Sequence, residues 1–289
     1  MQNIGFVGVG KIGLPICEHL IKKGFTVIGY RRSSLAEFEK LGGRPARSAA
    51  DVGGQADIVF TCLPDDAALE DVIHGPEGLL KTARAGQIVI ELGSHPVPVK
   101  QRYVAPLADK GVTFLDGEVS GTPGMVAQRK AVIYLGGPGA AVKTIEPIVA
   151  AFADLCLHLG EFGAATRVKL VNNFLVALHI AGTAQAMALG LKTGVDKDLL
   201  IKAVATGSGG STQFGIRAPW MAERKFLPQQ GSAAVLAHYL DTAKDMARDA
   251  GIATDLLDSM IDLYARAVPA IGDRDVAAIL EFFETTRRD

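Results

Sequence analysis

The stretch NIGFVGVGKIGLP, Asn3–Pro15, decides the fold of the first half of the chain. A β-branched and aromatic run comes first, and three glycines with the spacing G-x-G-x-x-G then lead into a helical pattern. In that context the glycines allow a tight turn and close backbone approach to a pyrophosphate, which the helix N-terminus faces. A glycine turn with a purely structural role is the alternative. We predict a dinucleotide site that includes Gly8, Gly10, Lys11, Ile12 and Gly13.

Outward from this turn, short β-branched runs alternate with helical segments as far as residue 160. The strand patterns cover 3–9, 25–30, 56–64, 86–92, 111–118 and 131–137. Helical patterns cover 14–24 and 140–152, and others start near Ser34, Asp65 and Pro96. This alternation predicts a parallel sheet with crossover helices, an α/β doubly wound fold of the Rossmann type.

After Gly160 the β pattern ceases. Residues 163–194 predict one long helix rich in Ala, Leu and Val, and shorter helices are expected around 196–205, 232–250 and 253–268. We therefore expect a dinucleotide-binding domain over residues 1–162, and an all-helical substrate and dimerisation domain over residues 163–289.

Composition excludes several classes of protein. With 30 Lys plus Arg against 31 Asp plus Glu, the net charge of -1 argues against nucleic acid as a partner. Polar or small residues interrupt the apolar runs, so no membrane span is expected. The N-terminus shows no secretory signal pattern. Cys17, Cys62 and Cys156 have no ligand spacing and are expected to be reduced thiols of a cytoplasmic protein.

The cofactor type is decided at the end of the second strand, where NAD-binding folds place an acidic residue for the ribose hydroxyl. Here stand Arg31, Arg32 and Ser33, two cations and a hydroxyl suited to a 2'-phosphate. NADP(H) is therefore favoured over NAD(H), and a pair of solvated loop arginines is the alternative. Leu63, Pro64 and Ser94 follow the third and fourth strands and are further candidate cofactor contacts.

Four segments together resemble the β-hydroxyacid dehydrogenase family, which includes 3-hydroxyisobutyrate dehydrogenases, tartronate semialdehyde reductases and glyoxylate or succinic semialdehyde reductases. They are GFVGVGKIGLP, FLDGEVSG, GEFGAATRVKLVNN and AVPAIGDRDVAAILEFF. The resemblance covers nearly the whole chain. In the third segment Lys169, Asn172 and Asn173 match the family's K-x-x-N-N in order and spacing.

The resemblance implies that Lys169 is the catalytic proton donor and acceptor. The chemistry is reasonable on its own terms, because hydride reduction of a carbonyl leaves negative charge on oxygen that an ammonium can stabilise and protonate. Asn173 lies one helical turn later on the same face and is suited to orienting the substrate oxygen or the lysine. By the same resemblance, Ser120, Gly121 and Thr122 belong to the loop that grips the substrate carboxylate.

The chain also departs from the family pattern. The family commonly has a proline where this chain has Glu118, and glycines where Thr122 and Arg129 stand. It usually carries a Lys-Asp-Leu on a C-terminal helix, and the alignment that needs no gap places His238 on that lysine. His238 is therefore either an ordinary helix residue or a contact to the cofactor or substrate.

The leading interpretation is an NADP(H)-dependent oxidoreductase that transfers a hydride between nicotinamide and a small β-hydroxy acid or aldehyde acid. One alternative is an imine reductase, a related group that generally lacks this lysine. Another is a non-catalytic NADP-binding protein. No metal site is expected, because the histidines show no ligand spacing. The apolar helix predicts a homodimer or tetramer, and the expected partner is otherwise a small-molecule substrate.

Overall fold

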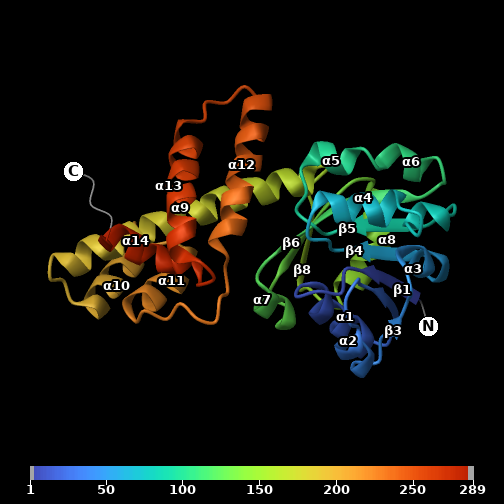
Figure 1. Ribbon diagram of the computed structural model, residues 1–289, viewed down its shortest axis with the longest axis horizontal. Coiled ribbons are helices and arrows are strands. Elements are labelled where there is room, and N and C mark those ends of the chain that lie inside the picture. The colour runs from blue at the N-terminus through green and yellow to red at the C-terminus, as the bar shows by residue number, and fades with distance from the viewer. Residues whose placement is uncertain (1–2, 286–289) are drawn as a thin grey trace. The chain divides into compact units, whose positions relative to one another are not determined.

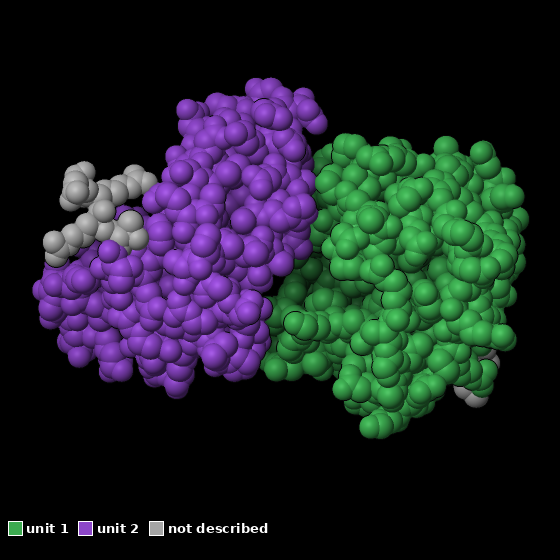
Figure 2. Space-filling view, viewed as in Figure 1, with its two compact units in different colours: residues 1–169 green, residues 170–289 purple. Residues whose placement is uncertain are grey.

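The computed structural model describes residues 3–285 of the chain. The chain divides into two compact units, Met1–Lys169 and Leu170–Asp289 (Figure 2). The division falls inside the long helix α9 (Ala164–Lys192), a few residues after the position expected from the change in sequence pattern.

Within the described residues, the first unit is built around an eight-stranded sheet with the order β3-β2-β1-β4-β5-β6-β7-β8 (Figure 1). The strands are β1 (Asn3–Val7), β2 (Thr26–Tyr30), β3 (Arg44–Pro45), β4 (Ile58–Thr61), β5 (Ile88–Glu91), β6 (Thr113–Ser120), β7 (Val132–Gly136) and β8 (Leu155–His158). The expectation of a parallel sheet is correct for most of it and wrong for β6 and β7, which pair antiparallel. Residues 121–131 between them are too few for the crossover that a parallel pair needs, so the chain turns back. The short strands β3 and β8 were not anticipated.

Both faces of the sheet are buried, and this explains the continuous apolar character of its central strands. In β4, Ile58 and Phe60 join the core on one face, whereas Val59 joins the core on the other. Ile90 and Val89 of β5 divide in the same way. Successive side chains of a strand point to opposite faces of the sheet. Because both faces are covered here, the side chains on each face are mostly apolar.

Short helices cover the two faces (Figure 1). They are α1 (Gly13–Lys22), α2 (Ala36–Lys40), α3 (Ala49–Gln55), α4 (Asp66–His74), α5 (Val97–Gln101), α6 (Val104–Ala108), α7 (Pro123–Ala127) and α8 (Gly139–Val149), with a 3-10 turn at Leu79–Lys81. Side chains cap several of these helices: at α3 the Ser48 hydroxyl accepts from the Asp51 N–H, and at α4 the Asp65 carboxylate accepts from the Ala68 N–H.

The order of the strands reverses at β1, because β2 lies on one side of it and β4 on the other. The loops that leave the carboxyl ends of β1 and β4 therefore diverge and leave a crevice between them. Open α/β sheets bind their ligands at such a switch point.

In the described residues of the second unit, all regular secondary structure is helical. After α9 it contains α10 (Lys197–Thr206), α11 (Thr212–Ala222), α12 (Ala233–Asp249), α13 (Asp255–Ile271), a 3-10 turn (Val276–Ala278) and α14 (Ile279–Thr285). Helices α11 and α14 were not anticipated. Tyr264 of α13 is fully buried and donates its hydroxyl to the Ala177 carbonyl of α9 at 3.1 Å, which fixes these two helices together.

By length and composition, α9 could cross a membrane, since an 18-residue window of it has a mean hydropathy of 1.6. Packing accounts for the apolar side chains along one side of the helix, because Ala177, Ile180, Ala184 and Met187 all lie in the core of the second unit. A core helix of this kind has the same composition as a membrane span, so α9 gives no support to a membrane location.

Candidate functional site

The three glycines of the turn after β1 have different structural roles. Gly8 has a positive φ of 99°, and a side chain there would collide with the carbonyl of Cys62. A Cβ at Gly13 would lie 2.6 Å from a ring carbon of Phe6, so the close packing of α1 on β1 requires glycine. A Cβ at Gly10 would meet no atom of the described residues within 4 Å. Gly10 therefore leaves open space beside the backbone, which fits the approach of a pyrophosphate.

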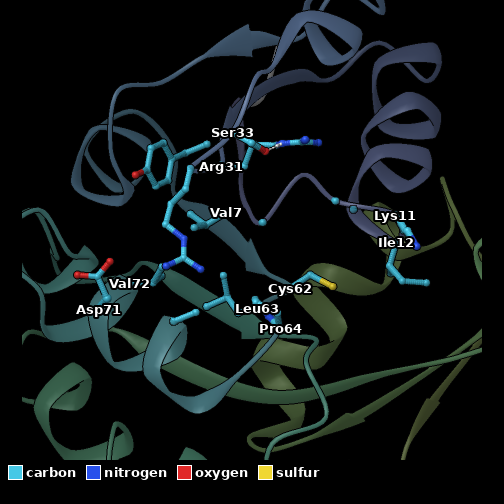
Figure 3. Close-up of a pocket in the computed structure, with 16 residues that line it drawn as sticks. Val7, Lys11, Ile12, Arg31, Ser33, Cys62, Leu63, Pro64, Asp71 and Val72 are labelled. Atoms are coloured by element: carbon cyan, nitrogen blue, oxygen red, sulfur yellow. Dashed lines mark hydrogen bonds between the residues drawn. The ribbon is translucent and has the colours of Figure 1, made fainter. Parts of the chain in front are cut away.

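A pocket of about 710 Å³ opens at the switch point (Figure 3). Its lining comes from the turn after β1, the end of β2, the loop after β4 and helix α4. The predicted cofactor residues in this lining are Gly8, Gly10, Lys11, Ile12, Gly13, Arg31, Arg32, Ser33, Leu63 and Pro64. Ser94 and His238 are the two predicted cofactor residues outside it. The structure thus brings together segments of the first half that lie far apart in sequence.

Arg31 is held in place at the end of β2. Its Nε donates to the Ser33 hydroxyl at 2.6 Å, and its Nη1 donates to the Val9 carbonyl at 2.8 Å. Figure 3 shows the hydrogen bond between Arg31 and Ser33 at the edge of the pocket. Two of the predicted residues therefore form one unit that is tied to the glycine turn, while Arg32 is exposed in the same lining.

Some of the pocket was not predicted from the sequence. Asp71 and Val72 of α4 also line the pocket, as does Cys62, which follows β4 (Figure 3). Their position in the sequence could have identified them, because α4 directly follows the loop after β4, and Leu63 and Pro64 of that loop were predicted. Burial raises the pKa of the Cys62 thiol to about 12, so it is a neutral lining group.

Lys169 is almost completely buried, with 7% of its surface exposed. Its Nζ donates to the carbonyl of Val119, the penultimate residue of β6, at 2.8 Å. Burial lowers the pKa of Lys169, and the nearby charge of Glu118 acts in the opposite direction. The lysine is thus no solvated bystander on a helix surface, and its ammonium lies beside the loop that begins at Ser120.

A buried ionic cluster lies behind Lys169. The Nζ of Lys100 lies 2.9 Å from a Glu91 oxygen, 2.9 Å from an Asp116 oxygen and 3.5 Å from a Glu118 oxygen. All four side chains have no exposed surface. Burial raises the pKa of Glu91 to about 8, although the Lys100 charge opposes this. Burial by itself lowers the pKa of Lys100, but its three carboxylate neighbours outweigh that effect and raise it.

Sequence reasoning missed most of this cluster. Single charges such as Glu91 and Lys100 were not singled out, because one charge in a chain is most often solvated. A signal was present in β6, where Asp116 and Glu118 lie two residues apart between apolar neighbours and so point to the same face of a buried strand.

The predicted carboxylate loop follows β6. Ser120 is the last residue of the strand, and Gly121 packs where a Cβ would lie 2.9 Å from the Cβ of Ala131. Thr122 caps helix α7, since its hydroxyl accepts from the Met125 N–H at 3.3 Å. Arg129, at a positive φ of 60°, forms an ion pair with Asp154 at 2.8 Å.

Two predicted residues belong to the second unit. Asn173 lies on α9 one turn after Lys169 and is 6% exposed. His238 lies on an exposed position of α12, and its ring centroid is 6.1 Å from that of Tyr239. Across residues 3–285, no group of three or more His, Cys, Asp or Glu side chains could hold a metal ion.

A Rossmann-type sheet with this pocket, followed by a helical unit, defines the class of NAD(P)-dependent oxidoreductases. Residues 3–160 match the family model described as the NAD binding domain of 6-phosphogluconate dehydrogenase. Residues 163–283 match the one described as NAD-binding of NADP-dependent 3-hydroxyisobutyrate dehydrogenase. The chain belongs to the β-hydroxyacid dehydrogenase family, and it is an NAD(P)-dependent dehydrogenase that acts on hydroxyl groups.

Individual relatives agree with this family. The chain is 30% identical to the L-threonate dehydrogenase of Cupriavidus necator, over 98% of this chain and 96% of the relative. It is 31% identical to the mitochondrial 3-hydroxyisobutyrate dehydrogenase of Rattus norvegicus, over 71% of this chain and 62% of the relative. The fold matches Mycobacterium tuberculosis 3-hydroxyisobutyrate dehydrogenase solved with L-serine, with a TM-score of 0.88 at 24% identity, covering 99% of this chain and all of that one.

The glycine turn makes a paired prediction. Gly10→Ala adds a methyl group toward open space, so we expect an unchanged Tm but a Kd for the dinucleotide raised about tenfold or more. Gly13→Ala drives a methyl group into the Phe6 ring, so we expect a loss of about 1–3 kcal/mol in the free energy of unfolding. Cofactor titration by fluorescence and urea denaturation measure the two effects. Equal affinity in Gly10→Ala and wild type would contradict the pyrophosphate assignment.

Proposed function

We propose that the protein is an NADP(H)-dependent enzyme that transfers a hydride between nicotinamide and a small β-hydroxy acid or aldehyde acid, with Lys169 as the proton donor and acceptor. The observation that carries this proposal is the burial of Lys169 beside the carboxyl end of β6, with its Nζ 2.8 Å from the Val119 carbonyl. A buried ammonium is costly unless it has a partner or a task.

The cofactor preference is supported by the end of β2. The Arg31, Arg32 and Ser33 side chains line the pocket where a carboxylate would serve the ribose of NAD. A guanidinium and a hydroxyl, held together at 2.6 Å, are suited to a 2'-phosphate. When bound, the nicotinamide supplies or accepts the hydride, and Ser94 and His238 are retained as further proposed contacts.

The proton chemistry is assigned to Lys169. In reduction, the ammonium stabilises the oxygen that gains negative charge and gives it a proton, and in oxidation the neutral amine accepts the hydroxyl proton. Burial lowers the pKa of Lys169, which makes release of that proton easier near neutral pH. Asn173, one turn later on α9, is proposed to orient the substrate oxygen.

The substrate class is inferred from the loop after β6 and from the relatives. The Ser120 hydroxyl and the backbone N–H groups of Gly121 and Thr122 are suited to a carboxylate. The relatives include dehydrogenases named for L-threonate, 2-(hydroxymethyl)glutarate, L-serine and 3-hydroxyisobutyrate. Each compound in these names carries a carboxylate and a hydroxyl group, so we propose a small hydroxy acid as the substrate.

The alternative functions are an imine reductase and a non-catalytic cofactor-binding protein. An imine reductase of Myxococcus stipitatus shares the fold with a TM-score of 0.66 at 19% identity, and the altered loop with Glu118 and Thr122 gives that reading some support. The retained Lys169 argues against both an imine reductase and a non-catalytic cofactor-binding protein. Rates of NADPH oxidation with glyoxylate, succinic semialdehyde, tartronate semialdehyde and cyclic imines separate the three: a preference for imines, or no turnover at all, would reject the proposal.

We also propose a division of labour and a location. Residues 1–162 bind the dinucleotide, and residues 163–289 form the substrate and dimerisation domain. The free thiols of Cys17, Cys62 and Cys156 are consistent with a cytoplasmic location.

The phosphate assignment predicts a selective loss. In Arg31→Ala/Arg32→Ala, we expect the KM for NADPH to rise about tenfold or more while that for NADH changes little, because only NADPH carries the 2'-phosphate. Steady-state kinetics with both cofactors measure this. Equal changes for the two cofactors would reject the NADP preference.

The catalytic role of Lys169 predicts a large loss of turnover. In Lys169→Met, we expect kcat to fall about a hundredfold or more while NADPH still binds, because the apolar chain fills the site without a transferable proton. Lys143→Met, at an exposed position of α8, is the matched control and should behave as wild type. Retained turnover in Lys169→Met would remove the proton-transfer role.

A homodimer or tetramer is proposed from one side of α9. Val171, Leu175 and Leu189 are 52%, 43% and 68% exposed, and their spacing places them along one stripe of the helix. We expect light scattering to show at least a dimer, and Leu175→Lys to favour the monomer because it places a charge on that stripe. Leu256→Lys, on α13 with 51% exposure at residue 256, is the control. A monomeric wild type would contradict the proposal.

A further inference from the structure

The carboxylate of Glu118 joins three elements of the first unit. Its Oε2 accepts a hydrogen bond from the Ser94 hydroxyl at 2.5 Å, in the loop after β5. Its Oε1 accepts from the Thr166 hydroxyl of α9 at 3.2 Å and lies 3.5 Å from the Lys100 ammonium of α5. Both oxygens are thus engaged, and the side chain has no exposed surface.

The same contacts fix the turn of α9 that carries Lys169. Thr166 lies three residues before Lys169, so both side chains are on one face of the helix. Asp116 accepts from the Thr166 backbone N–H at 3.0 Å and from its hydroxyl at 2.7 Å. Lys169 then donates to the carbonyl of Val119, the residue next to Glu118. The first turn of α9 is therefore held against β6 through polar contacts to two carboxylates.

Several ionisable groups face Glu118 from the elements around it. They are Cys62 after β4, Glu91 of β5, Lys100 of α5, Asp116 of β6, Tyr134 of β7 and Lys169 of α9. Glu91, Asp116 and Glu118 bring three carboxylates to the single ammonium of Lys100. Of these carboxylates, Glu118 is the one whose charge acts on Lys169.

We propose that Glu118 is a positioning residue for the proton-transfer step, since its carboxylate fixes Ser94 and the turn of α9 that carries Lys169, and its negative charge acts on the Lys169 ammonium. The proposal rests on the proposed catalytic function of Lys169.

The direction of the effect follows from the electrostatics. Burial lowers the pKa of Lys169, and the Glu118 charge raises it part of the way back. Burial raises the pKa of Glu118, while Lys100, Lys169 and the Ser94 hydrogen bond lower it. Removing the charge of Glu118 therefore lowers the pKa of Lys169. Reduction needs the protonated lysine and fails above this pKa, whereas oxidation needs the neutral lysine and fails below it.

Glu118→Gln tests the charge with little change in shape. We expect the alkaline limb of the pH profile of kcat for reduction and the acidic limb for oxidation both to move to lower pH by about one unit. A loosened structure would lower the rates without moving both limbs in one direction. Glu146→Gln, at an exposed position of α8, should leave both limbs unmoved. Limbs of Glu118→Gln that coincide with wild type would overturn the proposal.

Two further variants separate charge from position. Glu118→Asp keeps the charge but shortens the side chain, and Thr166→Val removes the hydroxyl whose single proton is shared between the two carboxylates. For each we expect kcat to fall about tenfold with the limbs unmoved. Should Glu118→Gln not fold, an unchanged kcat in Thr166→Val would overturn the positioning role.

Failure of this inference is distinguishable from failure of the proposed function. Retained turnover in Lys169→Met rejects the catalytic lysine itself. An inactive Lys169→Met with unmoved limbs in Glu118→Gln rejects only the role of Glu118.

Discussion

The burial of Lys100 among three carboxylates is the constraint on which the arrangement of the site depends. Its Nζ lies 2.9 Å from both Glu91 and Asp116, and none of these side chains reaches solvent. A buried charge without its partner is strongly destabilising, so the end of β5, helix α5 and the middle of β6 have to stay together. The position of Lys169 follows from this, because Asp116 also holds the first turn of α9.

The fold separates two tasks within the first unit. The reversal of strand order at β1 creates the pocket, and glycine at positions 8 and 13 permits the close approach of the chain segments around it. The proposed proton-transfer group, Lys169, lies at a different place, against the carboxyl end of β6. There a buried polar network, and not glycine, fixes the geometry. A fixed network suits proton transfer, because the donor and acceptor have to be held to a fraction of an ångström.

Several parts of the fold and site were predictable because their signals are local. The strands β1, β2, β4, β5, β6 and β7 coincide with runs of β-branched residues, and the glycine spacing stands directly between a strand pattern and a helix pattern. The short strands β3 and β8 were missed, since Arg44 and Pro45 or Leu155 to His158 become strands only through pairing with a distant neighbour. The antiparallel pairing of β7 was missed for a similar reason, because pairing direction depends on the path of the chain and not on composition.

The sequence by itself determined the order of elements, the dinucleotide turn, the cations at the end of β2 and the family. It also marked Lys169 as an unusual charge in an apolar helix. Only the tertiary structure decided that Lys169 is buried against Val119, that Asp71 lines the pocket at the switch point and that Glu118 joins Ser94 to Thr166. The physical reason is the separation in sequence of the residues that interact. Helix and strand patterns arise from residues a few positions apart. The burial of a charge instead depends on groups such as Glu91, Lys100, Asp116 and Thr166, which meet only after the sheet has formed.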